Sequence, residues 1–148
     1  MRTTPSPVPT PLAAPEIAAR LRLSATRLAR RLRQESGAGL SPSQQSALAV
    51  IANHGPLTLG ALAEHERVAP PSITKVVSKL ECDGLVTRTP DPSDRRICRV
   101  AISPDGEALL EESRRRKTAW LAARINELSP ERLRRLADAL DVLDELII

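Results

Sequence analysis

Residues 70–102 of this 148-residue chain read P-P-S-I-T-K-V-V-S-K-L-E-C-D-G-L-V-T-R-T-P-D-P-S-D-R-R-I-C-R-V-A-I. Pro70 and Pro71 are typical of the first turn of a helix, and Gly84 is typical of the position just after a helix end. Four aliphatic residues recur at helical spacing and predict one buried stripe: Ile73, Val76, Val77 and Leu80. We therefore predict a helix over residues 70–83, followed by two short strands over residues 85–89 and 97–102.

The segment between the two predicted strands is rich in proline and charge. Pro90, Pro92 and the aspartates rule out a regular strand, which predicts a projecting loop with Asp94, Arg95 and Arg96 near its end. An arginine at the tip of a narrow β-ribbon suits the minor groove of DNA, where the potential is most negative. The Asp94 carboxylate can accept hydrogen bonds from Arg96 and hold that side chain extended. The alternative is a surface turn with a screened ion pair.

The predicted helix over residues 70–83 has a polar side opposite its buried stripe. That side carries Pro71, Thr74, Lys75, Ser78, Lys79 and Cys82. Small hydroxyl side chains and lysines can enter a major groove and meet phosphates or base edges. The alternative is an ordinary solvated face of an amphipathic helix.

Helical patterns flank this segment on both sides. Before it, we predict helices that begin at Pro15 and at Pro42 and a short helix over residues 58–66. After it, we predict a long helix over about residues 105–128 and a final helix that starts after Ser129. Three short helices followed by a hairpin is the order of a winged helix-turn-helix. In the final helix an apolar seam with a 3, 4, 3, 4 spacing invites a partner helix: Leu133, Leu136, Leu140, Leu143 and Ile147.

Composition permits this interpretation without deciding it. The net charge is +4 and the sequence pI about 9.8, which is compatible with nucleic-acid binding. Tyr and Phe are absent, which argues against the stacking platforms that bind single-stranded nucleic acid. No run of residues is long and apolar enough for a membrane span or a signal peptide, so we expect no membrane partner and a cytoplasmic protein. Residues 1–14 hold four prolines and are predicted to form a disordered arm.

The segments L-T-L-G-A-L-A-E (57–64), P-P-S-I-T-K-V-V-S-K-L-E-C-D-G-L-V (70–86), D-P-S-D-R-R (91–96) and V-A-I-S-P-D-G (100–106) occur in this order. Together they resemble the MarR family of bacterial transcription regulators over about residues 15–148. The resemblance implies a mainly α fold with a small β-hairpin wing: a winged helix-turn-helix (41–103) between N- and C-terminal dimerisation helices (15–40 and 104–148). It also implies a homodimer that binds double-stranded DNA at a palindromic operator.

The resemblance also implies roles for individual residues. The recognition helix would enter the major groove, the wing arginine Arg96 the minor groove, Asp94 would anchor Arg96, and Arg95 would meet phosphate. The implied DNA-binding set is Pro71, Ser72, Thr74, Lys75, Ser78, Lys79, Asp94, Arg95 and Arg96. The implied dimerisation set is Ile17, Leu21, Leu133, Leu136, Leu140, Leu143 and Ile147.

The chain departs from the family pattern just before the recognition helix. Arg67 and Ala69 stand where a glycine and then a serine cap are usual. Pro71 follows Pro70, so two N–H groups are missing from the helix N-terminus and that end is a poorer phosphate receptor. We therefore expect side-chain cations to carry more of the DNA binding.

Other candidate sites are weaker. His54 and His65 have no cluster of Cys or His around them, so we predict no metal site and no cofactor. Cys82 and Cys98 leave a redox switch open as an alternative to two unreactive thiols. Trp120 is expected to pack in the long helix or, alternatively, to line an effector pocket. The cluster from Arg114 to Lys117 is expected to be a solvated helix face or, alternatively, a contact to phosphates.

The resemblance to the MarR family implies a sequence-specific, dimeric transcriptional regulator, most often a repressor in that family, released by a small-molecule effector. The sequence contains no nucleophile beside a base, no paired catalytic carboxylates and no phosphate-binding glycine loop, so we do not expect an enzyme. Two alternatives stay open: a metal- or redox-responsive sensor on the same scaffold, and a winged-helix module that binds protein.

Overall fold

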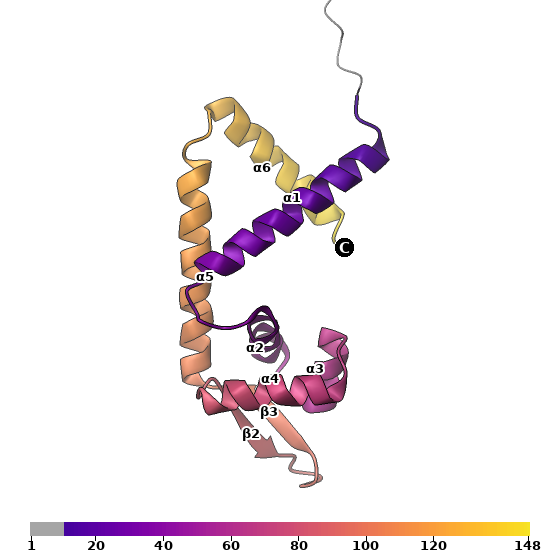
Figure 1. The fold of residues 1–148 in the computed structure, drawn as a ribbon, viewed down its shortest axis with the longest axis vertical. Coiled ribbons are helices and arrows are strands. Elements are labelled where there is room, and N and C mark those ends of the chain that lie inside the picture. Colours follow the sequence, from indigo (N-terminus) through magenta and orange to yellow (C-terminus); the bar gives the residue numbers. More distant parts are fainter. Residues whose placement is uncertain (1–10) are drawn as a thin grey trace, which may run out of the picture.

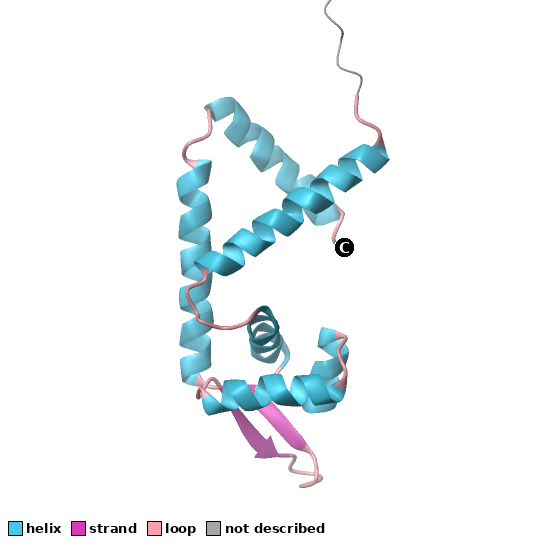
Figure 2. Cartoon of the chain, in the orientation of Figure 1, coloured by secondary structure: helices cyan, strands magenta, loops and turns pink. Residues whose placement is uncertain are grey.

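The computed structural model describes residues 11–148, and helices dominate it (Figure 2). The elements in chain order are α1 (Ala14–Glu35), α2 (Pro42–His54), β1 (Leu57–Thr58), α3 (Leu59–Glu66), α4 (Pro70–Cys82), β2 (Val86–Pro90), β3 (Cys98–Ile102), α5 (Pro104–Ile125) and α6 (Pro130–Glu145). The first ten residues of the predicted arm lie outside the described residues. Within residues 11–148, none of the helices has the length and apolar character needed to cross a membrane.

Four of the helices begin at a serine or threonine cap. The serine or threonine before each of four helices accepts a hydrogen bond from the backbone N–H three residues on. These bonds are Gln44 N–H to Ser41 Oγ (3.2 Å), Ala61 N–H to Thr58 Oγ1 (3.1 Å), Gly106 N–H to Ser103 Oγ (3.0 Å) and Arg132 N–H to Ser129 Oγ (3.4 Å). The long helix ends three residues earlier than predicted, at Ile125, because residues 126–128 form a turn.

The predicted hairpin is present, and it belongs to a sheet of three antiparallel strands in the order β1-β3-β2. The sequence does not reveal β1, because a strand of two residues has no alternation to detect. The prediction that Pro90 lies outside a regular strand was wrong: Pro90 is the last residue of β2 and pairs with Cys98. Because β2 lies at the edge of the sheet, a proline at its end is tolerated.

The hydrophobic core lies entirely between residues 47 and 100. It consists of Ala47, Leu48, Ile51, Leu57, Leu62, Ala63, Ile73, Val77, Leu80, Leu85, Val86 and Val100. Helices α2, α3 and α4 contact one another and the sheet around this core. The stripe predicted on the recognition helix is confirmed, with Ile73, Val77 and Leu80 buried and Val76 half-buried. A winged helix-turn-helix therefore forms one compact unit.

Helix α5 connects this winged unit to the rest of the chain. Figure 1 shows α5 as the long helix that rises from the sheet and leads into α6, with α1 crossing above the winged unit. Its start is anchored because Ser103 Oγ donates to the Gly84 carbonyl (2.6 Å) and Ser103 N–H donates to the Leu85 carbonyl (2.9 Å). Helix α1 packs against α5, and neither α1 nor α6 contains a buried residue.

Candidate DNA interface

The recognition helix α4 presents all of its predicted contact residues to solvent. Pro71, Ser72, Thr74, Lys75, Ser78 and Lys79 are exposed, while the opposite side of the helix packs into the core. The helix ends as predicted: Gly84 adopts a φ of +75°, and Leu85 N–H donates to the Leu80 carbonyl (2.9 Å). This tight end leads the chain directly into β2, and the hairpin of β2 and β3 lies beside α4 (Figure 1).

Two of these exposed side chains already have partners on their own helix. The Thr74 hydroxyl donates to the Pro70 carbonyl (3.0 Å), and Lys79 Nζ lies 3.1 Å from Asp83 Oδ1. Within residues 11–148, Lys75 makes no ion pair. Lys75 is therefore the α4 cation with the least compensated charge.

The N-terminus of α4 lacks a side-chain cap, as expected from the residues at that position. Its cap residue, Ala69, makes no side-chain cap bond, and Pro70 and Pro71 occupy the first two helical positions. Arg67, at the position where the family usually has glycine, adopts a left-handed φ of 54°. Such a conformation is unfavourable for a residue with a Cβ, so the turn before the recognition helix is strained.

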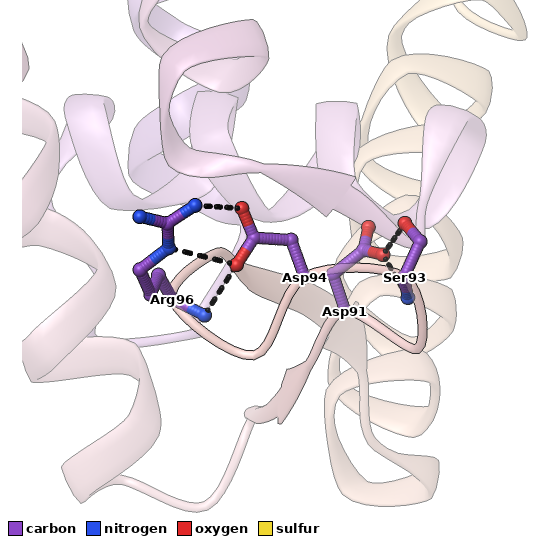
Figure 3. A network of polar contacts seen from close by, with 4 residues as sticks. All are labelled: Asp91, Ser93, Asp94 and Arg96. Carbon is purple, nitrogen blue, oxygen red and sulfur yellow. Dashed lines mark hydrogen bonds and ion pairs between the residues drawn. The ribbon is translucent and has the colours of Figure 1, made fainter.

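At the tip of the wing, Asp94 holds Arg96 in the predicted way. Arg96 Nε donates to Asp94 Oδ1 (3.1 Å), Arg96 Nη2 donates to Oδ2 (3.2 Å), and the Arg96 backbone N–H also donates to Oδ1 (3.0 Å) (Figure 3). These bonds hold the pKa of the Asp94 carboxyl below its usual value. The Arg96 side chain is nevertheless 89% exposed. A two-point clamp thus orients a guanidinium that remains available to a ligand.

The base of the wing is held by a second carboxylate, Asp91, which the sequence analysis missed. Asp91 is buried and accepts hydrogen bonds from the Ser93 hydroxyl (2.5 Å) and the Ser93 backbone N–H (2.8 Å) (Figure 3). It also accepts a hydrogen bond from Arg99 Nε (2.6 Å). The bonds from Ser93 and Arg99 hold the pKa of Asp91 far below its usual range. The Asp-Pro-Ser order is typical of a turn in which the Asp side chain bonds the backbone two residues on, and this signal could have identified Asp91.

These lowered pKa values determine how the wing responds to acid. A carboxyl whose pKa is lower in the folded state contributes stability that is present above its unfolded pKa. That contribution is lost progressively as the pH falls from the unfolded pKa through the folded pKa, which is lowered for both Asp91 and Asp94. The two clamps are therefore fully charged at neutral pH and stay so in mild acid.

Arg88 is a further residue near the interface that the sequence analysis did not identify. Its guanidinium Nη2 donates to the hydroxyl of Ser78 on α4 (3.0 Å), and its Nε lies 3.3 Å from Glu81 Oε2. Arg88 occupies the same face of β2 as the buried residue Val86, two positions away. A charged residue at an inward-facing strand position is the signal that could have revealed it.

The histidines, the cysteines and the tryptophan that were weaker candidate sites lie as follows. The rings of His54 and His65 stack with centroids 4.5 Å apart, and within residues 11–148 no three His, Cys, Asp or Glu side chains could hold a metal ion together. Cys82 and Cys98 are exposed. Trp120 is half-buried, and the guanidinium carbon of Arg124 lies over its ring, 3.8 Å from the centroid of the Trp120 ring.

The basic cluster in α5 is partly neutralised by its own helix. Arg115 Nη2 and Arg116 Nε lie 2.8 and 2.9 Å from Glu112 Oε1. These hydrogen bonds lower the pKa of Glu112 to about 2. The arrangement favours the predicted solvated face over a contact to phosphates.

The residues predicted to form the dimer leave much apolar surface uncovered in the single chain. Ile17, Leu133, Leu140 and Ile147 are exposed, whereas Leu21, Leu136 and Leu143 are half-buried. They are distributed over α1, α6 and the residue stretch just after α6. A helix with an apolar seam and no buried residue is stable only when another surface covers that seam.

Comparison with known proteins identifies the group to which this arrangement belongs. Residues 40–98 match the sequence model described as the MarR family. A regulator of the helix-turn-helix (HTH) type from Mycobacterium leprae is 42% identical over 132 residues, which cover 88% of this chain and 92% of that protein. The structure of a MarR family protein from Bacillus stearothermophilus superposes with a TM-score of 0.72 at 27% identity, covering 89% of this chain and 93% of that chain.

The fold is also similar to that of a protein whose structure was determined in complex with DNA. FabT from Streptococcus pneumoniae, in complex with DNA, superposes with a TM-score of 0.64 at 17% identity, covering 88% of this chain and 96% of that chain. The winged core, the exposed face of α4 and the charged wing agree with these similarities. The chain belongs to the MarR family of HTH-type transcriptional regulators.

Proposed function

We propose that two copies of this chain bind a palindromic operator and repress transcription, and that a small molecule releases them. The observation that carries the proposal is the wing: Arg96 is 89% exposed yet held by two hydrogen bonds from its guanidinium to Asp94. An extended, pre-oriented arginine loses little freedom on entering a minor groove. The exposed polar face of α4 lies beside it and suits the major groove.

In this proposal, affinity and specificity come from different side chains. Lys75 and Arg95 are exposed cations that neutralise phosphates, so binding weakens as salt rises. The small side chains Ser72, Thr74 and Ser78 approach base edges, where sequence is distinguished. Asp94 has no contact with DNA and acts only through Arg96.

A titration of operator binding tests the wing. Arg96→Ala is expected to weaken binding to the promoter DNA upstream of this gene by at least about fivefold, since one well-placed arginine contact contributes roughly 1–3 kcal/mol. Ser78→Ala removes one small hydroxyl and is expected to weaken binding by only about threefold. Equal and small effects of both substitutions would contradict the proposal.

Arg134→Ala is the matched control for this experiment. Arg134 is an exposed arginine of α6, so its removal changes the net charge by the same amount as Arg96→Ala but at a distance from the wing. It is expected to leave operator affinity within about twofold of the unmodified protein, because distant exposed charges are largely screened. A complex without sequence preference, or no complex at all, would favour the alternative of a protein-binding module.

The proposed effector site lies where the winged unit meets the other helices. A cavity of about 90 Å³ is lined by residues of the α1–α2 connection, α2 and α5, including Leu40, Gln45 and Leu110. A neighbouring hollow of about 330 Å³ shares Leu40 and Gln45 and adds Arg30 and Arg33 of α1. Apolar walls beside two guanidiniums suit a small organic anion.

Ligand binding at this junction tests effector release. Small organic carboxylates are expected to weaken operator binding by the protein, and the effect is expected to disappear in an Arg30→Ala/Arg33→Ala double variant. If that double variant responds to the same carboxylate with unchanged potency, the effector site lies elsewhere. Insensitivity of every variant to chelators and peroxide is expected, since the proposal uses no metal and no thiol.

A further inference from the structure

Arg88 lies on the wing strand but faces the recognition helix. Along β2, Val86 is buried, Thr87 and Thr89 are exposed, and Arg88 is partly buried opposite the fully buried Val100 of β3. Only 26% of the Arg88 side chain is exposed. The strand therefore presents a guanidinium to α4 at the edge of the core, where most strands carry an apolar residue.

Two side chains of α4 hold this guanidinium. Its Nη2 donates to Ser78 Oγ (3.0 Å), and its Nε, which is fully buried and makes no hydrogen bond within residues 11–148, lies at ion-pair distance, 3.3 Å, from Glu81 Oε2. Ser78 and Glu81 are three residues apart and therefore share one side of the helix. With one end near a carboxylate and the other on a hydroxyl, Arg88 has little freedom to turn away.

The contact determines which hydrogen bond Ser78 can offer to a ligand. A serine hydroxyl is one donor and has two acceptor lone pairs. One lone pair of Ser78 is taken by Arg88, and within residues 11–148 its O–H donates to no protein acceptor. The adjacent positive charge disfavours a second incoming N–H and strengthens the hydroxyl as a donor.

We propose that Arg88 is a specificity-determining positioning residue that makes Ser78 a hydrogen-bond donor toward DNA. This inference rests on the proposed operator binding. The base edge opposite Ser78 must then offer an acceptor in the major groove: N7 or O6 of guanine, N7 of adenine or O4 of thymine. An edge whose nearest group is an amino donor, as in cytosine, is disfavoured. Arg88 itself touches no base.

The test is a set of operators in which each base pair is varied in turn, with binding measured at one salt concentration. Ser78→Ala identifies the base pair at which the unmodified protein prefers an acceptor. At that pair Arg88→Met, which keeps the length of the side chain and removes its hydrogen bond to Ser78, is expected to reduce discrimination by up to about threefold, the effect of losing the Ser78 hydroxyl itself. In the Ser78→Ala background the same change is expected to have no further effect at that pair.

Arg95→Met is the matched control, because Arg95 is an exposed arginine of the same wing. It is expected to weaken binding to all operators by a similar factor and to reduce the salt dependence of binding, as the loss of a phosphate contact does. A Ser78-dependent change confined to one base pair therefore distinguishes a positioning role from a general loss of charge.

Circular dichroism shows whether Arg88→Met is folded. If it is not, a second variant at the same position tests the inference. Arg88→Lys keeps the charge and one donor, and it is expected to retain part of the discrimination. Discrimination at the Ser78 pair that is unchanged in a folded Arg88 variant would overturn the inference, as would an equal change at every pair. If the unmodified protein shows no sequence preference at all, the proposed operator binding fails instead.

Discussion

The winged unit and the helices α1 and α6 bury their apolar residues in opposite ways. All twelve hydrophobic core residues lie between Ala47 and Val100, and no residue of α1 or α6 is buried. Yet α6 carries an apolar seam as regular as any in the chain, with Leu140 still 51% exposed. The winged unit buries its apolar residues within a single chain, whereas α1 and α6 leave theirs exposed for another surface to cover.

This difference shows that apolar spacing predicts a buried face but not the surface that buries it. The stripe on α4 and the seam on α6 both have helical periodicity. The α4 stripe meets α2, α3 and the sheet of its own chain. Under the proposed function, a second copy of the chain covers the α6 seam. Substitutions at each region should then have separable effects on operator binding, fold stability and association.

The largest effect is expected from charges placed on the α6 seam. A Leu136→Glu/Leu143→Glu variant should be monomeric by light scattering, because paired seams would then bury like charges. Its operator affinity should fall at least about 100-fold, since two linked half-site contacts become independent. The winged unit should keep its own secondary structure by circular dichroism.

Val142→Glu is the control for the seam. Val142 is 56% exposed and lies on the side of α6 away from the leucines, so Val142→Glu places one carboxylate on α6 off the seam, against two on the seam in the double variant. This variant should remain dimeric and should bind the operator normally. A dimeric Leu136→Glu/Leu143→Glu variant would remove the contrast between the two regions.

A smaller effect, confined to the winged unit and its link to α5, is expected from Gly106→Ala. A Cβ at Gly106 would fall on the Leu85 carbonyl oxygen and crowd Ile102, where α5 meets the sheet. Overpacking against backbone should lower the free energy of unfolding by about 2–3 kcal/mol, measured by urea denaturation. Gly60→Ala in α3 meets only Thr58 Oγ1 at 4.0 Å and should raise stability by about 0.5–1 kcal/mol. Similar effects of the two substitutions would contradict the close approach at Gly106.

The smallest effect is expected at the turn before the recognition helix. Arg67→Gly should raise the free energy of unfolding by about 1 kcal/mol, because glycine adopts the left-handed φ of 54° without a Cβ clash. Gly84→Ala, at a φ of +75°, should lower it by a similar amount. Both values come from thermal or urea unfolding, and neither variant should change the dimer dissociation constant. A stabilised dimer in Arg67→Gly would show that the two regions are coupled.

Sequence patterns predicted most of the fold because its boundaries are local. Ser41, Thr58, Ser103 and Ser129 bond the backbone three residues on, so each helix start depends on a few neighbouring residues. The clamp of Asp94 on Arg96 is also local, two residues apart, and it was predicted for that reason. Strand β1 was missed because two residues carry no periodicity.

The sequence by itself determined most helix starts, the hairpin, the tip of the wing and the face that α4 exposes, since each depends on residues close together in the chain. Only the tertiary structure decided that Asp91 binds Arg99 across the wing and that Arg88 reaches Ser78 on another element. The Arg88 contact spans ten residues and depends on how β2 packs against α4. The alternation along β2 indicates that Arg88 faces inward, but which residue of α4 it meets follows from the fold as a whole.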